Sequence, residues 1–110
     1  MDKDSFVDLL KTFKKRASGL AKNCRDASGK QVQSAKLLAD LEGFATQWFD
    51  EIEPVLRGAY SLDEDVLLRY REPLGKILEL IGGRPSKSMV QTTLGSIAAS
   101  IHVDILLMLA

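Results

Sequence analysis

Cysteine and histidine are nearly absent from this 110-residue chain, and their scarcity limits its chemistry and its setting. Cys24 is the single cysteine, so no disulfide can form within the chain, and a secreted scaffold held by disulfides is excluded. His102 is the single histidine, which leaves too few ligands for a structural zinc site unless several carboxylates join. The first residues are charged and lack the apolar stretch of a secretory signal. A cytoplasmic protein is therefore expected.

Net charge, aromatic residues and strand signals are also missing or scarce. The 15 basic and 15 acidic residues cancel, so overall charge favours no class of partner. Aromatic residues make up 6% of the chain, which leaves few side chains for stacking on nucleic-acid bases. No segment sustains the apolar–polar alternation of a strand, and no Asn-Gly or Asp-Gly hairpin turn occurs. The sequence therefore predicts no sheet.

Apolar residues recur instead at steps of three and four, which keeps them on one face of a helix. Four helices are predicted: from about Ser5 to Cys24, from about Gln31 to Glu53, after Ser61 as far as Gly82-Gly83, and from Ser86 or Ser88 to the end. The predicted core residues are Phe13, Phe44, Trp48, Leu74, Ile97 and Ile101. Because the connections are short, we expect an all-α fold, an antiparallel four-helix bundle in a single domain over residues 1–110.

Two prolines should disturb this pattern. Pro54 is expected to stop or kink the second helix, because the residue before a proline, here Glu53, is biased away from helical angles. Pro73 falls inside the third helical pattern, so it should kink that helix or restart it with Pro73 in the first turn. The predicted bundle therefore has its third helix kinked near Pro73.

Two helix starts carry a capping signature. Ser61 with Glu64 reads as a capping box, in which the serine hydroxyl accepts a free amide and the glutamate reaches back. Ser88 with Gln91 is a second possible capping box, at the start of the fourth helix.

No constellation of residues predicts a catalytic, cofactor or metal site. Nothing in the sequence orients Cys24 and His102 as nucleophile and base. The segment 82–88 resembles a phosphate-binding loop only superficially, because it lacks the glycine before the lysine and a preceding strand. Arg84 and Lys87 still flank a predicted helix start, where an anion is favoured, although an ordinary loop explains them as well. An enzyme is therefore the least favoured interpretation.

Charge is segregated along the chain. Residues 1–36 carry a net charge of +5 and residues 37–72 a net charge of −6. At about 100° per residue, five basic residues of the first helix fall within an arc of about 100°, away from the apolar face. We call them the basic stripe: Lys11, Lys14, Lys15, Lys22 and Arg25. Solvent and salt, acidic residues of the same bundle, or an outside anionic partner could compensate these like charges.

The fourth predicted helix is apolar nearly all round and ends on an apolar run. Polar residues interrupt it, so a buried helix is favoured over a membrane anchor. Gly95 and Ala99, four residues apart, would allow another helix to approach closely. The terminal run predicts a partner interface: Ile105, Leu106, Leu107, Met108 and Leu109. A fragment of a longer chain is an alternative reason for such an end.

These patterns predict a helical module for protein–protein interaction or oligomerisation, since large apolar patches usually mark contacts. The alternative is a helical domain that binds nucleic acid through the basic stripe, with Arg84 and Lys87 as further anion-binding candidates. A net charge of zero and the scarcity of aromatic residues weigh against that alternative.

Overall fold

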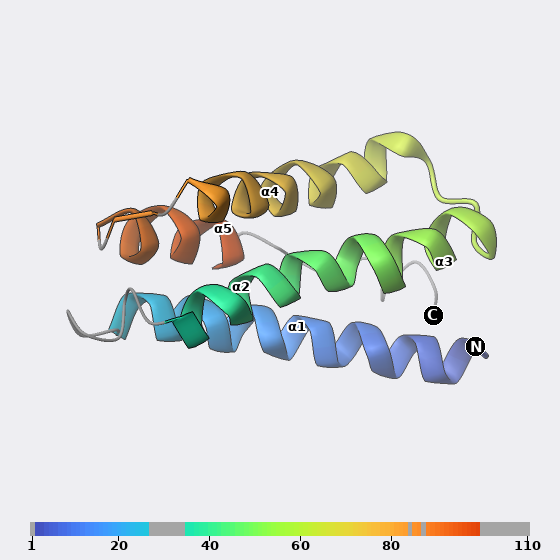
Figure 1. Cartoon of the computed structure of the whole chain (residues 1–110). Helices are drawn as coiled ribbons and strands as arrows, with labels where there is room; N and C mark the ends of the chain where they lie inside the picture. The colour runs from blue at the N-terminus through green and yellow to red at the C-terminus, as the bar shows by residue number, and fades with distance from the viewer. Residues whose placement is uncertain (1, 27–34, 84, 87, 100–110) are drawn as a thin grey trace.

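The computed structural model describes residues 2–26, 35–83, 85–86 and 88–99, and within these ranges the chain is helical without a strand. The elements are α1 (Lys3–Asp26), α2 (Ala35–Gln47), the π-helical turn η1 (Trp48–Ile52), α3 (Glu53–Gly58), α4 (Glu64–Gly82), the π-helical turn η2 (Met89–Leu94) and α5 (Gly95–Ala99). Because α2, η1 and α3 follow one another directly, as do η2 and α5, the described chain makes four helical rods that lie side by side (Figure 1). The predicted all-α class is confirmed.

Asp2 sets the start of α1. Its Oδ1 accepts a hydrogen bond from the amide of Ser5 at 2.7 Å, and its carbonyl accepts one from the amide of Phe6 at 3.1 Å. A side-chain acceptor before the first turn satisfies an amide that has no partner within the helix. The bond from Ser5 also lowers the pKa of the Asp2 carboxyl below its usual value. The helix therefore begins slightly earlier than predicted and runs to Asp26.

The second rod passes through Pro54, contrary to the expected stop. Glu53 has helical angles, φ −57° and ψ −43°, and its amide donates to the carbonyl of Trp48 in the wider π-helical pattern. Pro54 then lies in the first turn of α3, where a missing amide proton is tolerated. A π-helical turn just before the proline lets the rod continue to Gly58. In this turn, i→i−5 hydrogen bonds already replace the i→i−4 hydrogen bonds that a proline would break.

The predicted capping box at Ser61 is wrong. Asp63 precedes the first residue of α4, with extended angles (φ −62°, ψ 145°), and its carbonyl accepts the amides of Val66 and Leu67. Ser61 lies two residues earlier at φ 49°, in the turn that follows α3. Glu64 does not reach back to Ser61, because its carboxylate pairs with Arg57.

Pro73 lies inside α4, which is continuous, so the alternative in which the helix restarts at Pro73 is wrong. At the next helix start, the Ser86 hydroxyl accepts a hydrogen bond from the amide of Met89 at 3.3 Å. Ser88 already has helical angles and makes no side-chain capping bond, so the predicted Ser88–Gln91 capping box is also wrong. The first residue of this helix that the structure describes is Ser88, one of the two starts that the sequence predicted, and Ser86 supplies acceptors to the first turn from outside the helix.

Stacked aromatic rings occupy the core between the rods. Phe13 of α1 stacks on Phe44 of α2 with ring centroids 4.5 Å apart, and Trp48 stacks on Tyr70 of α4 at 4.8 Å. Phe13, Phe44, Trp48 and Leu74 are each 0% exposed, as predicted. Ile97 is only half-buried, because it packs at the margin of the core, and Ile101 lies outside the described residues.

Gly95 brings the fourth rod close to α1. A Cβ atom at Gly95 would lie 3.2 Å from the Cβ of Cys24 and 3.7 Å from the carbonyl oxygen of Ala21. The close approach predicted at this glycine is therefore present, and it fixes the rod that leads to the C-terminal segment against α1.

Candidate interaction surface

The lysines of the basic stripe lie on the outside of α1. Lys11, Lys14, Lys15 and Lys22 are all exposed, while the opposite face of the helix carries the core residues. Arg25 belongs to α1, but its side chain lies outside what the structure describes, as do Arg84, Lys87 and the run from Ile105 to Leu109. The structure therefore locates four of the predicted anion-binding residues and leaves the predicted apolar interface as a prediction.

None of these four lysines forms an ion pair within the part of the chain that the structure describes. Among the residues described, every ion pair joins Arg57 or Arg71 to Glu53 or Glu64, and none includes a lysine of the basic stripe. The sequence allowed three ways to compensate the like charges of the basic stripe. One of them, pairing with acidic residues of the same bundle, is not observed for the lysines that the structure describes. Solvent and an outside partner remain.

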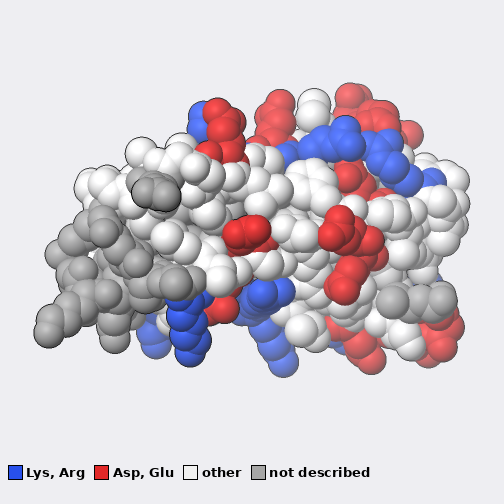
Figure 2. All heavy atoms as spheres, in the orientation of Figure 1, with Lys and Arg blue, Asp and Glu red and all other residues white. Residues whose placement is uncertain are grey.

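Carboxylates gather on a different part of the surface, over α2 and η1. Asp40 is half-buried, while Glu42, Asp50 and Glu51 are exposed, and none of the four is in an ion pair within the described part of the chain. In Figure 2, basic side chains project from the left and middle of the lower edge along α1, acidic ones lie at the right of that edge and across the middle, and both kinds mix over α4 at the top. We call Asp40, Glu42, Asp50 and Glu51 the acidic face.

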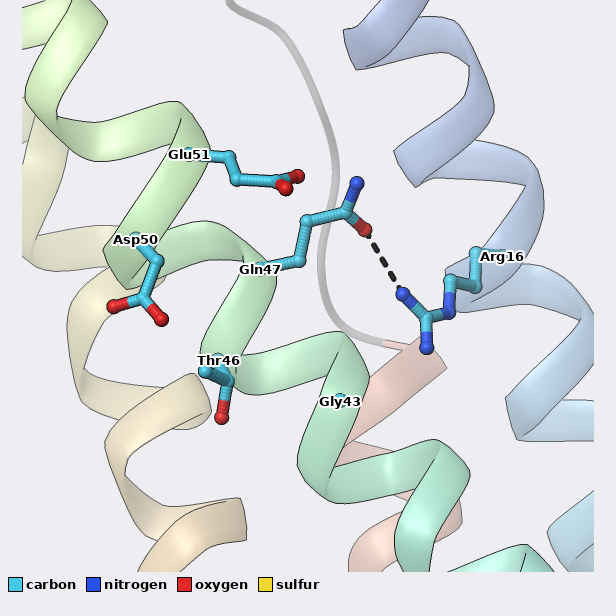
Figure 3. A pocket seen from close by; sticks show the side chains of 6 residues that line it. All are labelled: Arg16, Gly43, Thr46, Gln47, Asp50 and Glu51. Carbon is cyan, nitrogen blue, oxygen red and sulfur yellow. Dashed lines mark hydrogen bonds between the residues drawn. The ribbon is translucent and has the colours of Figure 1, made fainter.

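A hollow of about 380 Å³ opens between α1 and the acidic face, lined by Arg16, Gly43, Thr46, Gln47, Asp50 and Glu51. The guanidinium of Arg16 reaches from α1 toward the second rod, and its Nη1 donates to Oε1 of Gln47 at 3.0 Å (Figure 3). Glu51 extends over the gap between the two rods, whereas Asp50 points to the other side of its rod. The hollow thus has one cationic wall and an anionic rim.

Gly43 makes room for this arrangement. A Cβ atom at position 43 would lie 3.0 Å from Nη2 of Arg16, closer than carbon and nitrogen normally approach. The sequence pattern did not single out Arg16 or Gly43. A usable signal existed, because Arg16 lies at the edge of the apolar face of α1, away from the basic stripe, where it meets a neighbouring helix.

A second charged cluster joins α3 to α4 at the other end of the rods. Glu53 is 4% exposed, and its Oε1 lies 3.3 Å from Nη2 of Arg57 and 3.3 Å from Nε of Arg71. Arg57 also pairs with Glu64, which lowers the pKa of the Glu64 carboxyl and raises that of the Arg57 guanidinium. The four charges cancel, and the two arginines satisfy the buried carboxylate, so this cluster is a structural clasp.

Residues with catalytic potential are not assembled in the described part of the chain. Cys24 is buried, and burial raises the pKa of its thiol, which disfavours the reactive thiolate. No three of the described His, Cys, Asp and Glu residues are grouped so that they could hold a metal ion. None of the described helices is both long enough and apolar enough to span a bilayer.

Comparisons with models of protein families, with curated proteins and with solved structures find no match to this chain. Function is therefore inferred from the surface alone.

Proposed function

We propose that this chain is a helical interaction module that associates with a second copy of itself or docks on another protein, in a cytoplasmic setting. The observation that carries the proposal is the separation of charges that form no ion pair among the described residues: the exposed lysines of α1 lie apart from the acidic face over α2 and η1. Such a surface is complementary to any partner that presents the reverse arrangement, and a second copy is one such partner.

Repulsion within the basic stripe favours association. Lys11 is four residues from Lys15, and Lys14 is three from Lys11, so like charges are neighbours on one side of the helix. Each such pair destabilises a helix by about 0.2–0.5 kcal/mol, and carboxylates from outside would remove that repulsion. Association with an acidic partner surface is therefore favoured twice: by attraction between the two surfaces and by reduced repulsion among the lysines of the basic stripe.

The apolar run from Ile105 to Leu109 remains part of the proposed interface as a prediction from sequence. If it contacts a partner, Leu107→Glu or Leu109→Glu should produce a smaller species in solution, because a buried charge without a partner opposes the contact. An unchanged mass for both variants would remove the run from the proposal.

Light scattering of the purified chain, with and without added nucleic acid, tests the function. The proposal expects a mass above the 12.1 kDa of one chain that grows with protein concentration and does not depend on nucleic acid. A constant mass of one chain, with no binding of any protein partner, would overturn it.

Nucleic-acid binding is the second candidate, and the exposure of Lys11, Lys14, Lys15 and Lys22 along one side of α1 supports it. Affinity should then fall steeply with salt, by about 0.9 in the log–log slope for each phosphate neutralised on duplex DNA and about 0.7 on single strands. A gel-shift titration at two salt concentrations tests this, with Lys14→Glu, Lys15→Glu and Lys22→Glu together as the non-binding variant. Absence of a salt-sensitive complex with the wild type would reject this function.

We further propose that the four rods are antiparallel neighbours and that α4 bends at Pro73. Contacts between α1 and the second rod support the first point, because Phe6 near the start of α1 meets Tyr60, whereas Phe13 further along α1 meets Phe44, earlier in the second rod. The missing amide of a proline inside a helix supports the second. An experimental structure with parallel rods or a straight α4 would contradict the respective point.

A further inference from the structure

The hollow beside Arg16 has the chemistry to receive a basic side chain. Glu51 carries its carboxylate over the hollow, whereas Asp50 lines it but points to the other side of its rod. Arg16 of α1 is the one cation among the described lining residues, and it is turned toward Gln47 of α2. The described lining residues carry a formal charge of −1, and neither carboxylate is in an ion pair among the described residues. Figure 3 shows the Glu51 side chain extending from the second rod toward the side of α1.

We propose that this hollow seats a lysine of the basic stripe from a second copy of the chain, with the lysine ammonium against the carboxylate of Glu51. The inference rests on the proposed function and names the partner and the site for it. A second copy fits because it carries both parts: exposed lysines on α1 and carboxylates on η1, none of which is in an ion pair within the described ranges. A nucleic acid would be attracted by the stripe but repelled by the acidic face.

Lys11 suits the seat best because of its neighbour on α1. Asp8, also exposed, lies three residues before Lys11 and therefore on a similar side of the helix. Arg16 offers an acceptor such as Asp8 further donors, because its guanidinium has five N–H groups and the hydrogen bond to Gln47 uses one. The segment from Asp8 to Lys15 thus offers a cation for the carboxylate of the hollow and a carboxylate for its guanidinium.

Charge reversal on each side provides the test. One variant reverses the stripe with Lys11→Glu and Lys15→Glu, and the other reverses the rim with Asp50→Lys and Glu51→Lys. Each alone should raise the dissociation constant for self-association at least tenfold, because like charges then face each other. An equimolar mixture of the two should recover association, since each variant offers the charge that the other lacks.

Two matched controls lie on α4, which carries neither the basic stripe nor the acidic face. Arg69→Glu with Lys76→Glu changes the charge by the same amount as the stripe variant, and Glu72→Lys with Glu79→Lys matches the rim variant. All four side chains are exposed, so neither control should alter the dissociation constant. A milder variant, Glu51→Gln, keeps the shape of the hollow and should still weaken association if the double rim variant fails to fold.

The outcomes separate this inference from the proposed function. If the wild type associates and both reversed variants associate equally well, the contact lies elsewhere, which overturns the inference and leaves the function standing. Loss of association in both variants without recovery in the folded mixture also overturns the inference. A wild type that stays monomeric at every concentration overturns the inference together with self-association.

Discussion

Gly95→Ala tests how closely the fourth rod packs on α1. Gly95 has ordinary helical angles, φ −61° and ψ −42°, so alanine suits the backbone and should gain about 0.8–1.0 kcal/mol of helix propensity. Its new Cβ would nevertheless lie 3.2 Å from the Cβ of Cys24. Both atoms are fixed to helix backbones, so the helices themselves must move, and overpacking of this kind costs about 1–3 kcal/mol. We expect a net destabilisation of up to about 2 kcal/mol.

Gly19→Ala is the matched control, because a Cβ at Gly19 of α1 would have no neighbour within 4 Å. It should stabilise the fold by up to about 1 kcal/mol, since only the propensity gain applies. Urea unfolding followed by circular dichroism gives both values, and the difference between the two variants isolates the packing cost. If Gly95→Ala stabilises the protein as much as Gly19→Ala does, the close approach of the two helices is refuted.

Three further predictions concern the core, a turn and the charged clasp. Trp48→Ala should destabilise the fold by about 3–5 kcal/mol, because Trp48 is 0% exposed, and native fluorescence that is already water-like would contradict its burial. Ser61→Gly should raise the urea midpoint slightly, since Ser61 has φ 49° and glycine adopts such angles without a side-chain clash; a lowered midpoint would argue against strain there. Pairing with Arg57 lowers the pKa of Glu64, so its stabilising contribution is present above the usual glutamate pKa and is lost as pH falls through the folded value. Glu64→Gln should therefore flatten the fall in thermal stability below about pH 4, and an unchanged pH profile would exclude that contribution.

Helical periodicity was enough to predict the fold class and most of the core. Phe13, Phe44 and Trp48 recur at helical spacing, and burial of one face requires only that a neighbouring helix covers it. Local signals around Pro54 and Ser61 were less reliable. Both sites depend on backbone hydrogen bonds that residue propensities do not describe. A π-helical turn precedes Pro54, and in the turn after α3 it is Asp63, not Ser61, that takes the N-cap position of α4.

The candidate surface was predicted only in part, for a related reason. Exposure of the lysines on α1 follows from their position opposite the apolar face, so the sequence was sufficient. The hollow depends on Arg16 crossing to Gln47 over Gly43, three residues from two different rods. Proximity across 31 positions of the sequence is a property of the tertiary packing, which a single sequence does not encode in its periodicity.

Sedimentation of the wild-type chain across a salt series tests charge-driven association most directly. Screening shortens the Debye length from about 10 Å at 0.1 M salt to about 3 Å at 1 M. If lysines of one copy meet carboxylates of another, the mass should exceed 12.1 kDa at low salt and return toward that value as salt rises. A mass of one chain at every salt concentration would contradict association, and a larger mass that persists or grows at high salt would show an apolar contact in place of the charged one.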